Sequence, residues 1–147
     1  MVSIHSASIV RMTDYLVPHG PGFRFVDNVE FLENGKRVRA TKYLSPTLPF
    51  FTDHFPGNPL MPGVLLIECA AQAAGCLWGN QTSQSEPEKY LLAQVLTFKL
   101  LRPTLPEQIL MIEASLERDF GKLAQFSVEI LESSELVANG RIVLAKQ

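Results

Sequence analysis

The feature that most constrains this chain is an apolar stretch from Leu60 to Trp78. Pro62 suits the first turn of a helix, and residues 63–78 contain no further proline, which predicts a helix there. Apolar side chains occupy almost every side of this helix, so the rest of the fold must enclose it. Glu68 and Gln72 interrupt the stretch and no basic residues flank it, which favours a buried helix over a membrane span.

Most of the remaining chain shows the composition and alternation of β-strands. Residues 23–31 and 36–44 lie on either side of Asn34-Gly35, which predicts a β-hairpin. Four long runs follow the helix: Tyr90 to Leu101, Gln108 to Arg118, Lys122 to Leu131 and Glu135 to Lys146. Long strands joined by short turns imply antiparallel pairing. We therefore expect residues 1–147 to form a single domain of class α+β, in which an antiparallel sheet of about six strands wraps the central helix.

Composition excludes several classes of function. The chain is 46% hydrophobic and 19% charged, and its formal charge of −2 gives no bulk attraction to nucleic acid or to an anionic membrane. Cys69 and Cys76 share a face of the predicted helix but lie too far apart for a disulfide, so we expect buried thiols in a reducing cytoplasm. The sequence has no metal-ligand spacing and no glycine-rich nucleotide loop, and Met1 to Arg11 lacks the pattern of a secretion signal.

Two polar residues in the apolar region call for a chemical explanation. His54 lies in a loop rich in glycine and proline, and Glu68 lies on the enclosed helix. A charged, unpaired carboxylate in such surroundings is costly, so Glu68 should either find partners or stay protonated, and a protonated Glu is a general acid. An imidazole is suited to be a base at neutral pH, which is the role we expect for His54. Gln72 lies one turn after Glu68 and can orient its carboxyl group.

The start of the helix offers a further element of chemistry. The unpaired amides of Gly63 and Val64 can receive an oxyanion, and a glycine lets a substrate approach the backbone closely. The same residues also have purely structural interpretations, since a loop histidine is often exposed and Gln72 could fill a packing defect. Asp53 could orient His54, but neighbours on an extended chain point in opposite directions, so we expect Asp53 to be exposed to solvent.

The whole string from Leu48 to Gly75, LPFFTDHFPGNPLMPGVLLIECAAQAAG, closely resembles the signature of the β-hydroxyacyl-acyl carrier protein dehydratases of the FabZ type. In this resemblance the family's histidine falls on His54 and its acidic residue on Glu68. The sister FabA-type dehydratase-isomerases have Asp where this chain has Glu. The resemblance therefore favours the simple dehydratase branch.

The resemblance continues outside this string. Pro18-His19, Phe23 and Val26-Asp27 are similar to the family's N-terminal segment, and the order of strands fits its hotdog fold over essentially the full chain. The chain departs from the family at Gly20-Pro21-Gly22, Gln94, Leu96 and Pro106-Glu107-Gln108. These departures bear on acyl-chain preference and carrier recognition, and they favour a specialised pathway over housekeeping fatty acid synthesis.

The resemblance implies dehydration of a 3-hydroxyacyl chain, carried on acyl carrier protein, to the trans-2-enoyl thioester. His54 would take a proton from C2, Glu68 would give a proton to the C3 hydroxyl, and the amide of Gly63 would hold the carbonyl oxygen. The family uses neither a metal nor an organic cofactor. One site of the family takes its His and Glu from two subunits, so we expect a homodimer, and hotdog families often assemble further into trimers of dimers.

This interpretation includes two further expectations and leaves three alternatives open. We expect an acyl tunnel lined by Phe51, Phe55, Leu60, Met61, Val64 and Leu65, with Leu91, Leu92 and Phe98 as additional candidates. An acidic carrier could dock on Lys36, Arg37, Arg39, Lys42, Lys99 and Arg102. The alternatives are a hotdog acyl thioesterase, a FabA-like isomerase that also forms the cis-3-enoyl product, and a non-catalytic module that binds acyl groups or carrier protein.

Overall fold

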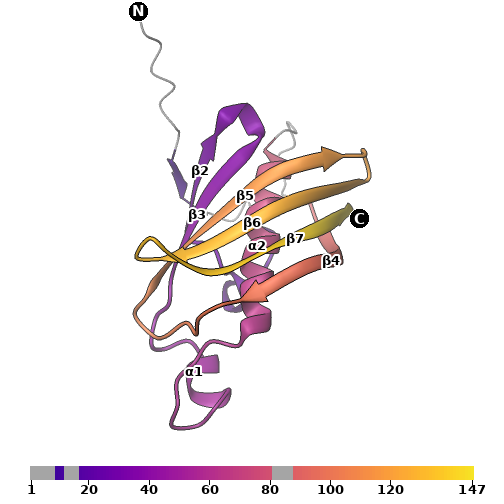
Figure 1. Cartoon of the computed structure of the whole chain (residues 1–147). Helices are drawn as coiled ribbons and strands as arrows, with labels where there is room; N and C mark the ends of the chain where they lie inside the picture. The colour runs from indigo at the N-terminus through magenta and orange to yellow at the C-terminus, as the bar shows by residue number, and fades with distance from the viewer. Residues whose placement is uncertain (1–8, 12–16, 81–87) are drawn as a thin grey trace, which may run out of the picture.

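The computed structural model, which describes residues 9–11, 17–80 and 88–147, packs one long helix against an antiparallel sheet (Figure 1). The long helix is α2 (Gly63–Gly79), and a short helix, α1 (Phe50–Asp53), precedes it. The strands are β1 (Ile9–Arg11), β2 (Asn28–Leu32), β3 (Arg37–Tyr43), β4 (Tyr90–Leu100), β5 (Ile109–Asp119), β6 (Leu123–Glu132) and β7 (Glu135–Lys146). The expected α+β class, with a sheet wrapped around one apolar helix, is confirmed. The short β1 is an additional strand that the sequence pattern does not reveal.

The predicted hairpin is formed by β2 and β3. A 3₁₀ turn at Glu33–Gly35 joins the two strands, and Gly35 has a φ of +82°, which favours glycine. β2 begins at Asn28, later than the predicted start at Phe23. The reason is local: residues 21–23 form a 3₁₀ turn, and the backbone N–H of Phe25 donates to the side chain of Gln72 instead of to a neighbouring strand.

The sheet order is β1-β2-β3-β5-β6-β7-β4. Consecutive strands pair from β5 through β7, but β4 pairs with β7 and not with β5. The intervening residues 101–108 cross the end of the sheet and are fixed there by backbone hydrogen bonds, including Met61 N–H to Thr104 O and Glu107 N–H to Leu44 O. As a result β4 lies at the edge of the sheet, while β5 lies in its middle (Figure 1).

The core lies between the concave face of the sheet and α2. Alternate residues of β5 and β6, such as Ile112 and Phe126, are fully buried, and most of α2 is buried with them. Trp78 fixes the C-terminal end of α2, because its Nε1 donates to Asp119 Oδ2 over 3.1 Å and its ring stacks on Tyr90 at 4.8 Å. The C-terminal end of α2 is therefore held against β4 and the end of β5.

The edge strand β4 is exposed along nearly its whole length. Its exposed side chains include large apolar ones, and Leu91 and Leu100 are more than half accessible. An open edge of this kind presents unpaired backbone groups and apolar surface to any second strand. In the described residues, no other strand covers the free side of β4.

Three smaller expectations can be compared with the structure. Cys69 and Cys76 are both buried and are not joined in a disulfide, as expected. No helix in the described parts of the chain is long and apolar enough to cross a membrane. The loop expected after α2 falls mostly on residues 81–87, and the N-terminal segment examined for a secretion signal falls mostly on residues 1–8, both outside the described residues.

We predict that Gly140→Ala destabilises the fold, because Gly140 of β7 lies directly against β4. A Cβ at this position would collide with the carbonyl oxygen of Thr97 and would lie 2.9 Å from the Cα of Phe98. Such overpacking should lower the free energy of unfolding by about 1–3 kcal/mol, measured by urea denaturation. Gly20→Ala is the matched control, because its Cβ would meet nothing within 4 Å. Equal stability of the two variants would contradict the pairing of β4 with β7.

Candidate active site

The centre of the candidate site is the Gln72 side chain on α2. Its Nε2 donates to Glu68 Oε1 over 3.1 Å and to the carbonyl oxygen of Phe23 over 2.9 Å, and its Oε1 accepts the backbone N–H of Phe25 over 2.8 Å. Gln72 itself is only 4% exposed. The buried amide thus holds the Glu68 carboxyl in one orientation and ties α2 to residues 23–25. The predicted contact between Gln72 and Glu68 is therefore present.

A second group contacts the same carboxyl oxygen. His19 Nε2 lies 3.4 Å from Glu68 Oε1, and both side chains are partly exposed. The backbone of His19 is held by Arg24, whose Nε donates to the His19 carbonyl oxygen over 2.7 Å. The sequence pattern alone did not identify His19 as a site residue, although the Pro18-His19 pair was part of the family resemblance. That pair is the signal that could have identified it.

His54 lies apart from this cluster, at the end of α1. Its Nδ1 is 3.0 Å from the carbonyl oxygen of Leu60, and its ring packs on Phe55 with centroids 4.1 Å apart. A carbonyl can only accept a hydrogen bond, so Nδ1 carries the proton of the neutral ring and Nε2 is left with its lone pair. The side chain is exposed, as is the neighbouring Asp53, in agreement with the expectation for Asp53. The imidazole can therefore present a basic nitrogen to a molecule outside its own loop.

The residues expected at the oxyanion site begin α2. Pro62 is the N-cap of the helix, Gly63 is its first residue, and Val64 is 70% exposed. A Cβ on Gly63 would lie 2.5 Å from Leu100 Cδ1 of β4. The side chain of Leu100 in the same chain thus lies close against the backbone of Gly63.

The residues expected to line the acyl tunnel are distributed over several environments. Phe51 and Met61 are buried in the core, Leu65 packs against it, Leu60 is half-buried, and Phe55 is 51% exposed. None of these five, nor Val64, lines the cavity that opens beside Glu68, whereas Leu92, one of the additional candidates for the tunnel, does line it. That cavity is bounded by residues 17–19, by Glu68, Ala71, Gln72 and Gly75 of α2, and by Glu88, Tyr90 and Leu92.

The cavity beside Glu68 is small, at about 50 Å³. Pockets that bury whole ligands usually measure roughly 300–1,000 Å³. His54 does not line this cavity, so within one chain the structure brings Glu68 together with Gln72 and His19 but leaves His54 outside. A single chain thus keeps Glu68 and His54, the two residues expected to act as acid and base, in separate places.

Two other kinds of chemistry have no support in the described residues. Burial raises the pKa of the Cys69 and Cys76 thiols to about 12, so neither is a thiolate nucleophile at neutral pH. No group of three or more His, Cys, Asp or Glu side chains in residues 9–11, 17–80 and 88–147 is arranged to hold a metal ion.

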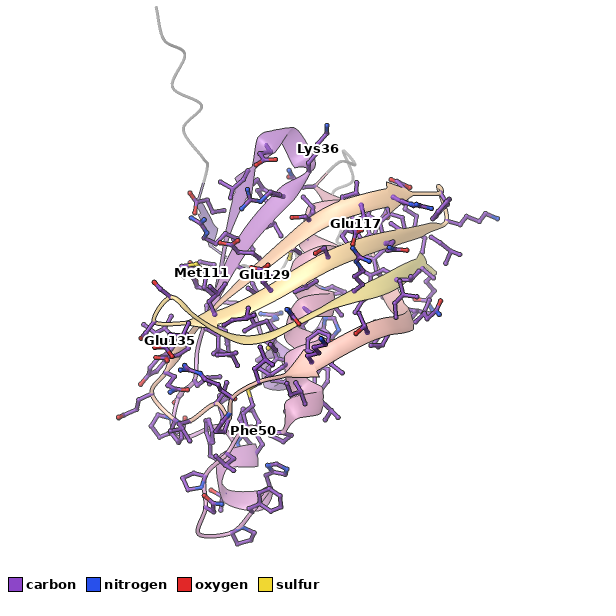
Figure 2. All side chains as sticks on the ribbon, in the orientation of Figure 1. Lys36, Phe50, Met111, Glu117, Glu129 and Glu135 are labelled. Atoms are coloured by element: carbon purple, nitrogen blue, oxygen red, sulfur yellow. The ribbon has the colours of Figure 1, made fainter. Side chains whose placement is uncertain are left out.

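The basic residues considered for carrier docking are mostly engaged by carboxylates. Arg37 and Arg39 share Glu113, Lys42 is buried beside Asp27, and Arg102 contacts Glu132 and Glu135. Lys36 and Lys99 are exposed. Figure 2 shows Lys36 at the tip of the β2–β3 hairpin, at the opposite end of the molecule from Phe50 and α1. The six residues therefore do not form one continuous basic patch.

The sequence of the chain matches a known protein family. Residues 17–145 match the family model of the FabA-like domain. The 3-hydroxyacyl-[acyl-carrier-protein] dehydratase FabZ of Proteus mirabilis is 34% identical over 144 residues, which are 97% of this chain and 95% of the relative. The protein of the same name from Klebsiella pneumoniae is 35% identical over 132 residues, which are 89% of this chain and 87% of the relative.

Solved structures share the fold at lower identity. The dehydratase heterocomplex ApeI:P from Xenorhabdus doucetiae superposes with a TM-score of 0.76 at 18% identity, over 91% of this chain and 90% of that one. The uncharacterized protein PH1136 from Pyrococcus horikoshii gives a TM-score of 0.63 at 14% identity, over 92% and 87% of the two chains. The sheet wrapped around α2 is thus the hotdog fold, and the chain belongs to the FabA-like domain family as a relative of the FabZ dehydratases.

Proposed function

We propose that this protein dehydrates 3-hydroxyacyl groups carried on acyl carrier protein, with Glu68 as the acid and His54 as the base. The observation that carries the proposal is the Glu68 carboxyl on an enclosed helix, held by Gln72 at 3.1 Å, in a chain that belongs to the family of the FabZ dehydratases. Elimination of water from a 3-hydroxyacyl thioester needs a base at C2 and an acid at C3. A carboxyl group and an imidazole with a free nitrogen supply both.

In the proposed reaction Nε2 of His54 takes the proton from C2. The electron pair of the C2–H bond becomes the second bond between C2 and C3, and the C3–O bond breaks. The departing hydroxyl takes the proton of Glu68 and leaves as water, so the product is the trans-2-enoyl thioester. His54 then returns its proton to solvent and Glu68 is reprotonated, which restores both groups for the next turnover.

The start of α2 is our proposed site for the thioester carbonyl. Helix N-termini carry unpaired N–H groups and the positive end of the helix dipole, and both stabilise negative charge that develops on an oxygen. Gly63 and Val64 are the first two residues of α2, and their amides would face the carbonyl oxygen as the C2 proton is removed. Gln72 is a positioning residue, because it acts by orienting Glu68.

We propose that the active unit is a homodimer formed along β4. The free edge of this strand is exposed and apolar, and pairing it with β4 of a second copy would continue the sheet across both chains. The same assembly would supply what one chain lacks, because His54 of one subunit could then complete the site of Glu68 in the other. Further assembly into a trimer of dimers is compatible with this arrangement.

The proposed partner is acyl carrier protein, and the proposed compartment is the cytoplasm. The names of the FabZ relatives specify an acyl carrier protein substrate. Of the six basic residues considered, Lys36 and Lys99 are exposed, and they are the candidates to meet an acidic carrier. Two buried cysteines that are not joined in a disulfide fit a reducing compartment.

We predict that His54→Ala and Glu68→Gln each lower kcat by about 10²–10⁴-fold, because each removes one partner of general acid–base catalysis. The measurement is loss of water from 3-hydroxybutanoyl-acyl carrier protein, followed by mass spectrometry, with folding checked by circular dichroism. Asp53→Asn is the control, because Asp53 is an exposed neighbour of His54 with no role in the mechanism.

Three results would contradict the proposed function. Release of free thiol without enoyl product would assign the protein to the thioesterases, and saturable acyl binding without turnover would assign it to the binding modules. Wild-type activity of folded Glu68→Gln would remove Glu68 from the reaction. Formation of the cis-3-enoyl product beside the trans-2-enoyl product would add isomerase activity and thereby correct the assignment to the simple dehydratase branch.

We predict that Leu96→Asp on β4 weakens the dimer and lowers specific activity in dilute solution. The variant places a charge on a strand edge that the dimer would bury, which should raise the dimer dissociation constant by about tenfold or more. Phe120→Asp is the matched control, because Phe120 is 65% exposed in the β5–β6 turn. Specific activity and light scattering are measured against protein concentration. A monomer with full activity would contradict the proposed dimer.

A further inference from the structure

The cavity beside Glu68 lies between one face of α2 and the start of β4. Glu68, Ala71 and Gly75 follow one another along this face at helical spacing, and Tyr90 lies over the end of the row. On the helix side, the residues that follow Glu68 along this face are therefore an alanine and a glycine, which are small and leave room for a chain. An acyl chain whose C3 hydroxyl meets Glu68 would extend along this row towards Tyr90.

Tyr90 fits closely against two glycines of α2. A Cβ on Gly75 would lie 3.3 Å from Tyr90 Cδ2, and a Cβ on Gly79 would lie 3.4 Å from the Tyr90 hydroxyl oxygen. The ring therefore occupies the space that side chains at these two positions would fill. This close contact leaves no room for an acyl chain between Tyr90 and Gly75.

The ring of Tyr90 is also held in place from two other sides. It stacks on Trp78 with centroids 4.8 Å apart and an interplanar angle of 23°, and its hydroxyl donates to Glu88 Oε2 over 2.7 Å. Burial raises the pKa of the Tyr90 phenol above its ordinary value, so the hydroxyl keeps its proton and remains the donor. Tyr90 is thus fixed by aromatic stacking, by a hydrogen bond and by contact with α2.

The cavity that Glu68 and Tyr90 both line is small. At about 50 Å³ it is about one third of the roughly 150 Å³ apolar cavity that binds a benzene molecule in an engineered protein. By the same proportion it admits about two carbon atoms. A longer chain would have to displace the ring of Tyr90 and break its contacts with Trp78 and Glu88.

We propose that Tyr90 closes the acyl end of the active site and restricts the enzyme to short 3-hydroxyacyl chains, with about two carbon atoms beyond C3. The proposal rests on the dehydratase function and on Glu68 as its acid. It assigns substrate length to a residue of β4 that neither the sequence motif nor the acid–base pair includes.

The test compares kcat/KM for 3-hydroxybutanoyl, 3-hydroxyhexanoyl, 3-hydroxyoctanoyl and 3-hydroxydecanoyl groups on the same carrier. For the wild type we expect a fall of about tenfold or more once the chain exceeds the cavity. In Tyr90→Ala, the ratio of kcat/KM for decanoyl to that for butanoyl should rise by about 100-fold or more, because the obstruction is gone. Tyr90→Phe keeps the ring and should keep the wild-type ratio.

Two further variants make the result specific. Tyr43→Ala removes an exposed tyrosine of β3 and should leave the ratio unchanged. Tyr90→Leu retains apolar packing against Trp78 and should shift the ratio in the same direction as Tyr90→Ala, which keeps the test decisive if Tyr90→Ala does not fold. Equal use of all four chains by the wild type, or an unchanged ratio in folded Tyr90→Leu, would overturn the role of Tyr90. Failure to dehydrate any of the four would instead overturn the proposed function.

Discussion

The hydrogen bonds of the Gln72 amide are the interaction on which the candidate site depends. Both donors and the acceptor of this side chain are used: it binds Glu68, the carbonyl of Phe23 and the backbone N–H of Phe25. Because these groups lie at the edge of the apolar core, loss of the amide would leave polar groups without partners, at a cost of about 1–3 kcal/mol each. The same side chain therefore fixes the orientation of the proposed acid and attaches the segment that carries His19. Gln72 therefore contributes both to the stability of the fold and to the geometry of the candidate site.

The sequence predicted the architecture well because hydrophobic periodicity determines it. The apolar helix, the hairpin around Asn34-Gly35 and the four later strands are all present, with boundaries shifted by a few residues. Position in the sheet could not be predicted, because nothing in the pattern of β4 specifies pairing with β7 instead of β5. In the site, the contact between Gln72 and Glu68 follows from helical spacing. The contact of His19 with Glu68 depends on the path of a loop, and no periodicity describes that path.

Closeness to His54 along the chain did not predict which residues line the cavity beside Glu68. Phe51 and Met61 lie close to His54 along the chain, yet both are buried in the core of a single chain. The cavity beside Glu68 is instead bounded by residues 17–19 and by the start of β4, which are remote in sequence. Strand β4 thus links three properties of the molecule. Its outer edge is open for a second copy, its Leu100 packs against Gly63, and its Tyr90 closes the cavity that begins at Glu68.

In the proposed dimer a complete site takes His54 from one subunit and Glu68 from the other, and a mixing experiment tests this arrangement. His54→Ala and Glu68→Gln proteins, each inactive alone, are unfolded together, refolded as a mixture and assayed for dehydration. A mixed dimer would contain one site with both native residues, so random pairing should restore about a quarter of wild-type activity in a symmetric dimer. A mixture as inactive as its components, with mixed dimers demonstrated by native mass spectrometry, would contradict the shared site.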